Sequence, residues 1–105
     1  MCSQRRKPEL PEEIRRAADL LERRWALRVL YACDSGAIRF NDFTSACSGI
    51  PPGTLAARLA ELEHAGILER RVSSEARPPR VEYRLTERGE DLRALLSALK
   101  RFAGP

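Results

Sequence analysis

The sequence is poor in the residues on which metal and enzyme chemistry depend. It holds one histidine and three cysteines, and no two cysteines form a C-x-x-C pair. A zinc site needs a cluster of such ligands, so no metal is expected. An odd number of cysteines also does not suit a disulfide framework. Only His64 offers an imidazole base, and no nucleophile stands at a defined spacing from it, so we expect no catalysis.

Long apolar runs are absent as well. No stretch is long enough to cross a bilayer. The first residues, 1–7, are polar and basic, and no apolar core of a signal peptide follows them. These absences predict a cytoplasmic protein without a membrane partner. We interpret residues 1–10 as a mobile basic tail, solvated rather than bound to phosphates, and residues 11–105 as a single domain.

Charge and hydrophobicity are typical of a basic globular protein. Hydrophobic residues make up 43% and charged residues 32% of the 105 residues, and the formal net charge is +4. A basic balance favours a polyanionic partner, with nucleic acid ahead of an anionic membrane surface. An arginine-rich composition can also arise without such a partner, so charge alone decides little.

The central stretch predicts two helices, over residues 40–47 and 54–65, joined by a tight turn with two prolines and two glycines. Phe40 and Phe43 are expected to bury the first of these helices. Two helices with a short glycine-containing turn are how helix-turn-helix proteins present a recognition helix to the DNA major groove. An ordinary helical hairpin in a helical domain is the alternative.

The second helix of this pair has two distinct faces. Leu55, Leu59 and Leu62 recur at i, i+4 and i+7, which indicates one buried face. The residues expected on the opposite face are Thr54, Ala57, Arg58 and Glu61. Arg58 is the candidate for a bidentate contact with guanine, worth roughly 1–3 kcal/mol of discrimination. The alternative is an ion pair between Arg58 and Glu61 along the same helix.

A β-hairpin is predicted after this helix. Residues 67–73 and 80–85 are interpreted as strands, and Val81, Tyr83 and Leu85 alternate on one face of the second strand. The tip holds two prolines, where no ladder donor is needed, and arginines flank them. An arginine-edged hairpin suits a DNA minor groove, or it is a charged edge that resists aggregation. The residues expected to contact DNA are Arg39, Asn41, Pro52, Gly53, Thr54, Ala57, Arg58, Arg77 and Arg80.

Apolar stripes at both ends of the domain predict helices that one small domain cannot cover. The first helix begins at Pro11, a second runs from near Trp25 to about Asp34, and the last follows the cap residue Thr86. Part of these stripes is therefore expected to pack against a second copy of the chain. The residues expected in this dimer interface are Ile14, Ala18, Leu21, Leu92, Leu95, Leu96, Leu99 and Phe102.

Short motifs spread along residues 11–102 match a known pattern. They are Trp25 followed by Leu27 and Leu30, Arg39-Phe40 with Phe43, Arg58-Leu59 with Leu62-Glu63, Gly66-Ile67-Leu68, and above all Val81-Glu82-Tyr83 with Leu85-Thr86-Glu87 and Gly89. This set resembles the HxlR-type winged-helix transcriptional regulators, within the wider MarR-like group. The resemblance implies an α+β, mainly helical fold: a winged helix-turn-helix with a β-hairpin wing and N- and C-terminal dimerisation helices. It also implies homodimers that bind operator DNA.

The chain departs from that family's pattern at several positions. Members commonly carry a cysteine ahead of the first helix, which in some of them senses oxidants or electrophiles. Here that neighbourhood is Leu10-Pro11, and Cys2 lies too far upstream. Pro51 and Gly53 replace the cap serine and the basic residue usual at the start of the recognition helix. Fewer phosphate contacts are expected as a result.

Together these patterns predict a gene regulator, expected to act as a repressor, that binds double-stranded DNA as a homodimer. The expected target is a pseudo-palindromic operator with half-sites about one helical turn apart. Arg39 and Asn41 are expected at phosphates, with bracing of the hairpin as the alternative for Arg39. The competing class is a winged-helix module that docks proteins instead of specific DNA. No cofactor is expected, and no polar cluster indicates an effector pocket.

Overall fold

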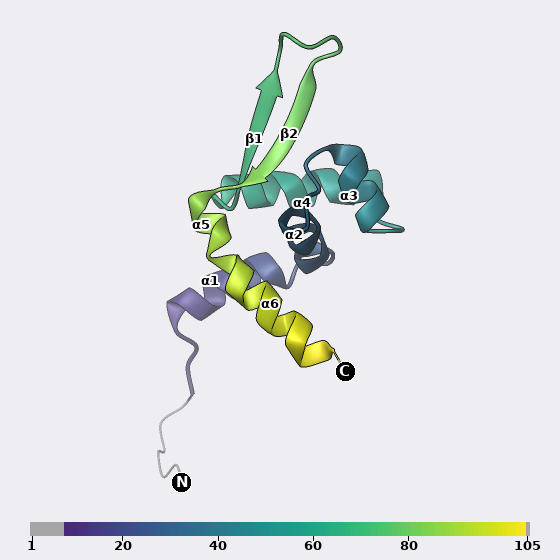
Figure 1. Cartoon of the computed structure of the whole chain (residues 1–105). Coiled ribbons are helices and arrows are strands. Elements are labelled where there is room, and N and C mark those ends of the chain that lie inside the picture. Colours follow the sequence, from purple (N-terminus) through teal and green to yellow (C-terminus); the bar gives the residue numbers. More distant parts are fainter. Residues whose placement is uncertain (1–7, 105) are drawn as a thin grey trace.

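The computed structural model describes residues 8–104 of the chain. A body of packed helices carries one two-stranded hairpin that stands out from it (Figure 1). Most of the tail predicted over residues 1–10 lies outside the described residues, and so does Cys2. Within the described residues, no helix has both the length and the apolar character needed to cross a membrane.

The elements follow the predicted order closely. Helices α1 (Glu12–Leu21), α2 (Ala26–Asp34), α3 (Phe40–Ala46) and α4 (Pro52–His64) precede strands β1 (Leu68–Ser73) and β2 (Arg80–Leu85), and helices α5 (Glu87–Glu90) and α6 (Leu92–Ala103) come last. The mainly helical winged helix-turn-helix fold is therefore confirmed. We call the β1–β2 hairpin, residues 68–85, the wing.

The core lies where α2, α3 and α4 meet. Leu55, Leu59 and Leu62 of α4 are each 1% exposed or less, so the predicted leucine row is confirmed. Burial of each such side chain contributes roughly 1.5–3 kcal/mol to folding. Phe43 is fully buried beside them, but Phe40 keeps 37% of its surface exposed, contrary to expectation. Phe40 is the first residue of α3 and therefore lies at the margin of the core.

The base of the wing is tied to the helical body at two places. The ring of Tyr83 meets Phe43 edge-on, with 6.1 Å between ring centroids. The backbone N–H of Tyr83 also donates to the carbonyl of Ile38, at 2.8 Å, in the connection between α2 and α3. Farther out, Val72 pairs with Val81 and is about half exposed. The wing is thus anchored at its base and stands free toward its tip.

Thr86 joins the end of the wing to the end of α4. Its hydroxyl accepts the backbone N–H of Gly89 at 3.0 Å, which makes Thr86 the predicted cap of the helix that follows. The same hydroxyl donates to the carbonyl of Gly66 at 2.6 Å. Gly66 ends α4 with a positive φ of 79°, the left-handed conformation that favours glycine at a helix stop.

The last helix is interrupted, although the sequence predicts a continuous one. The N–H of Asp91 donates to the carbonyl of Arg88, three residues earlier, at 3.2 Å. In a regular α-helix it would donate to the carbonyl four residues earlier. This tighter turn separates α5 from α6. The change of direction brings Leu96 of α6 into the core, where it is 4% exposed. Leu96, expected in a dimer interface, therefore covers its own domain.

The two terminal helices have little to pack against within one chain. No residue of α1 is buried, and Ile14 is 52% exposed. On α6, Leu95 and Leu99 are exposed and Phe102 is 87% exposed. Ala18, Leu21 and Leu92 are half-buried. Both helices lie at the end of the molecule opposite the wing tip (Figure 1).

Candidate nucleic-acid interface

Helices α3 and α4 form the helix-turn-helix. The turn between them reverses at Gly49, whose φ is +91° and favours glycine, and it buries Cys47 and Ile50 beneath it. Pro51 precedes α4, and no side chain caps the first turn of that helix. Gly53 is exposed, and a Cβ added there would meet nothing within 4 Å. The first N–H groups of α4 are therefore left without a side-chain partner.

The exposed face of α4 is turned relative to the predicted one. Ala56, Ala60 and Glu63 are exposed. The residues expected to be outermost are half-buried, namely Thr54, Ala57, Arg58 and Glu61. At about 100° per residue, the centre of the exposed set lies roughly 140° around the helix axis from the centre of the expected set. The leucine row gives the buried face, but the neighbours that cover one flank of the helix decide where the exposed face lies.

Arg58 lies on that covered flank. Its side chain is 14% exposed, and its Nη1 donates to Glu61 Oε1 at 2.7 Å. Its Nε is buried and has no partner among the described residues. The intrahelical ion pair, which was the alternative to a guanine contact, is thus present. A guanidinium held this way is not displayed toward a base edge, as the predicted contact requires.

The second carboxylate oxygen of Glu61 connects the Arg58–Glu61 ion pair to another part of the fold. Arg23 Nη2 lies 3.6 Å from Glu61 Oε2. Arg23 belongs to the corner between α1 and α2, which is fixed by Trp25 packing against the core. Arg24 and Arg28 flank the Trp25 ring, 5.9 and 5.0 Å from its centroid. We call Arg23, Glu61 and Arg58 the α4 network.

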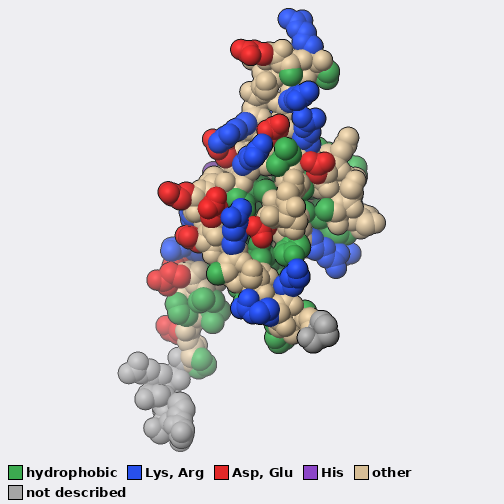
Figure 2. Space-filling view, in the orientation of Figure 1, with side chains coloured by type: hydrophobic (Ala, Val, Ile, Leu, Met, Phe, Trp, Pro, Cys, Tyr) green, Lys and Arg blue, Asp and Glu red, His purple; other side chains and the backbone are tan. Residues whose placement is uncertain are grey.

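The wing supplies arginines that are free of carboxylate partners. Arg77 and Arg80 are exposed, and neither takes part in an ion pair within the described residues. Arg71, by contrast, lies 3.0 Å from Glu69 on the same strand. Figure 2 shows Lys and Arg side chains spaced along the hairpin as far as its tip. Positive charge is therefore available at the part of the wing that stands clear of the body.

At the start of α3, Arg39 and Asn41 are exposed. Arg39 Nη2 lies 3.9 Å from Glu82 Oε2, so the side chain reaches the wing. This contact matches the alternative expectation for Arg39, which was bracing of the hairpin. Asp42 closes the first turn of α3 by accepting the N–H groups of Arg39 and Ile38, at 3.0 and 3.1 Å. These two hydrogen bonds lower the pKa of the Asp42 carboxyl, because they favour its charged form.

The thiols within the described residues are held in their protonated form. Burial raises the pKa of Cys33 to about 11, with the charge of Asp34 adding to the effect. Burial also raises the pKa of Cys47. The thiolate is the reactive species, so neither side chain has the low pKa of a reactive cysteine. No group of three possible metal ligands occurs in residues 8–104.

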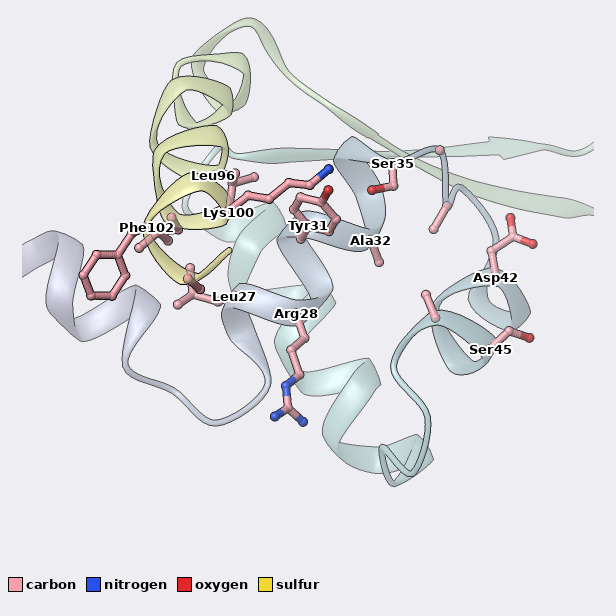
Figure 3. Close-up of a pocket in the computed structure, with 15 residues that line it drawn as sticks. Leu27, Arg28, Tyr31, Ala32, Ser35, Asp42, Ser45, Leu96, Lys100 and Phe102 are labelled. Atoms are coloured by element: carbon pink, nitrogen blue, oxygen red, sulfur yellow. The ribbon is translucent and has the colours of Figure 1, made fainter. Parts of the chain in front are cut away.

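An open groove separates α6 from α2 and α3, with a volume of about 1060 Å³. Its apolar lining includes Leu27, Tyr31, Leu99 and Phe102, and Lys100 stands among them (Figure 3). The groove could not be predicted from the sequence, because α6 lies far along the chain from the other two walls, α2 and α3. Its exposed apolar side chains coincide in part with the predicted dimer surface.

Relatives of known class match most of the chain. The uncharacterized HTH-type transcriptional regulator YvaP of Bacillus subtilis is 32% identical over 90% of this chain and 87% of its own length. The regulator sll1512 of Synechocystis is 39% identical over 85% of this chain, which spans only 65% of that relative. The HTH-type regulator YodB of B. subtilis is 37% identical over 83% of this chain and 77% of its own length.

Solved structures agree with the fold. The reduced form of YodB superposes with a TM-score of 0.77 at 33% identity, covering 90% of this chain and 92% of that one. The oxidized form of the redox regulator HypR gives a TM-score of 0.78 at 33% identity, covering 86% and 92%. The family described as HxlR-like helix-turn-helix matches residues 20–104. The chain therefore belongs to the HxlR-like family of helix-turn-helix transcriptional regulators, and not to a family of enzymes.

Proposed function

We propose that the protein binds a pseudo-palindromic operator as a homodimer and represses the genes beside it. The observation that carries the proposal is the division of the molecule into two ends. One end presents the helix-turn-helix and the wing, and the opposite end presents α1 and α6 with exposed apolar side chains such as Ile14 and Phe102. A second copy that covers the apolar end would place two recognition helices side by side for two half-sites.

The start of α4 supports a close approach to the duplex. Pro52, Gly53 and Thr54 begin the helix without a side-chain cap, so the N–H groups of Gly53 and Thr54 are free for a phosphate at the positive end of the helix dipole. Ala56 and Ala60 are small and exposed, which lets the helix axis lie near the bases. Ala57, at the edge of this face, would contact apolar groups such as a thymine methyl.

Side chains outside α4 supply the positive charge. Arg39 and Asn41 at the start of α3 would contact phosphates next to the recognition helix. Arg77 and Arg80 would place the wing on the backbone or in the minor groove. In this arrangement the wing accounts for much of the affinity, because the exposed face of α4 carries no arginine or lysine in the described structure. Repression then follows from occupancy, since a dimer seated on promoter DNA excludes other proteins from it.

Replacing Arg80 by alanine is expected to weaken binding to every duplex to a similar degree. A lost phosphate contact releases one fewer counterion, so the slope of log K against log salt should fall in magnitude by about 1. The measurement is fluorescence anisotropy with labelled duplexes over a range of salt concentrations. Arg71→Ala is the matched control, because it removes the same charge from an arginine already paired with Glu69. A salt slope identical to that of the wild type removes Arg80 from the interface.

Genomic footprinting of the tagged protein, followed by gel shifts with the fragments it selects, tests the proposed function. We expect protection of two half-sites related by a dyad, and retention of the selected fragment under excess unrelated DNA. A winged-helix docking module would give only weak retention that is blind to sequence. Increased transcription upon binding would contradict repression while leaving operator binding intact.

A further inference from the structure

The α4 network contains a charge that the fold must keep paired. Arginine does not lose its proton in proteins, and the Arg58 side chain is 14% exposed. Among residues 8–104 its carboxylate partner is Glu61, at 2.7 Å, and its Nε has no partner there. Loss of the Glu61 charge would leave a largely buried cation unbalanced, which costs more than the ion pair itself contributes. The rotamer and position of Glu61 are therefore closely determined.

Glu61 also reaches beyond its own helix. Its other oxygen lies 3.6 Å from Arg23, at the corner between α1 and α2. An ion pair of a 58% exposed arginine contributes little to stability by itself. Its position is what matters, because Trp25 holds this corner against the core. The carboxylate of Glu61 thus pairs with Arg58 of its own helix through one oxygen and with Arg23, outside that helix, through the other.

This sharing bears on how α4 is presented. The row Leu55, Leu59 and Leu62 fixes which side of the helix faces the core, and the contacts on the half-buried flank that carries Arg58 and Glu61 set the remaining roll of the helix about its axis. Roll decides whether Ala56 and Ala60 face outward and where the free N–H groups at the helix start point. Hydrogen bonds to DNA weaken steeply with misalignment, so a small roll would reduce recognition.

We propose that Glu61 is a positioning residue for DNA recognition, which sets the roll of α4 by holding Arg58 with one carboxylate oxygen and Arg23 with the other. The inference rests on the proposed function, since it assumes that α4 meets the operator. Because Arg23 lies directly beyond the end of α1, the network also links the helix at the dimer end to the helix at the DNA end. Arg58 then serves recognition from inside the fold.

The test compares Glu61→Gln with Glu90→Gln, in the full chain. Both variants remove one negative charge, and Glu90 is exposed on α5, away from the helix-turn-helix. Affinities are measured for the duplex selected by footprinting and for a scrambled duplex of the same length and composition. For Glu61→Gln we expect the ratio of the two affinities to fall about tenfold, the scale of one misaligned base contact. Glu90→Gln should keep the wild-type ratio.

Three further readouts separate positioning from a general loss of structure. The salt slope of Glu61→Gln should equal that of Glu90→Gln, because positioning removes no phosphate contact. Arg23→Met, at an exposed position that leaves the Arg58–Glu61 pair intact, should lower the affinity ratio about threefold and keep the protein folded. The effects of Arg23→Met and Glu61→Gln on the ratio should be less than additive in the double variant, because both act through one carboxylate.

Each outcome points to one conclusion. If the wild type prefers the selected duplex and Glu61→Gln keeps that preference, the positioning role is overturned while the proposed function stands. Fully additive effects of the two substitutions would also overturn it, because they would show that Arg23 and Glu61 act separately. If the wild type does not distinguish the two duplexes, the proposed function fails and the inference fails with it.

Discussion

Replacing Gly89 by alanine is expected to destabilise the protein by about 3 kcal/mol or more, because the new methyl group has no room. A Cβ at this buried position would overlap the carbonyl oxygen of Ile67 and come within 3.1 Å of Leu85 Cδ2. Ile67 cannot withdraw easily, since its N–H bonds the carbonyl of Leu62 at 2.9 Å and its carbonyl accepts the N–H of Thr86 at 3.0 Å. A melting temperature lower by about 10 °C or more follows.

The measurement for this prediction is thermal unfolding followed by circular dichroism, at one protein concentration for all variants. Gly53→Ala is the control, because Gly53 lies in the first turn of α4 and a Cβ there meets nothing within 4 Å. The control should be neutral or more stable by roughly 0.5–1 kcal/mol, since alanine loses less backbone entropy than glycine. A Gly89→Ala protein that melts with the wild type would show that α5 does not pack on Ile67 as described.

Replacing Phe102 by aspartate is expected to dissociate the proposed homodimer. The side chain is 87% exposed in a single chain, so the substitution removes almost nothing from the fold of one copy. In a symmetric pair the same substitution occurs twice. Each loss of a buried aromatic side chain costs roughly 1.5–3 kcal/mol, and each new charge must also be desolvated. We expect the dimer dissociation constant to rise about a hundredfold or more.

Sedimentation velocity over a range of protein concentrations measures this effect. Val72→Asp is the control, because Val72 is another exposed apolar residue, 51% accessible, but it lies on the wing. The control should sediment as the wild type does. The Phe102→Asp variant should also lose most of its affinity for a two-half-site operator while its melting curve at high concentration stays single and cooperative. A wild type that sediments as one copy at all concentrations would refute the dimer itself.

The helices and strands whose hydrophobic residues recur at a regular spacing could be predicted from the sequence. The alternation of Val81, Tyr83 and Leu85 places β2 at residues 80–85, and the structure has it at Arg80–Leu85. The leucine row of α4 likewise identifies the buried face of that helix. In both cases the signal lies within a few neighbouring residues, because one side of a regular element faces the core.

What the sequence could not provide depends on contacts between distant segments. The roll of α4 is decided by which neighbours cover its flank, so Arg58 was expected outside and lies mostly inside. Leu95 and Leu96 are adjacent in the sequence and point about 100° apart around α6, and contacts with distant segments decide that Leu96 enters the core while Leu95 stays exposed. The DNA-contact and dimer residues remain predictions that only a complex can test.

The backbone hydrogen bond from Tyr83 to the carbonyl of Ile38 has a consequence for the choice of DNA. It joins the base of the hairpin to the connection in front of α3, so the base of the wing keeps its position relative to the helix-turn-helix. We therefore expect a half-site to lose affinity when a base pair is inserted between the bases that α4 contacts and the backbone that the wing contacts. In the proposed homodimer, adjustment to operators of different length would then come from the interface between the two copies.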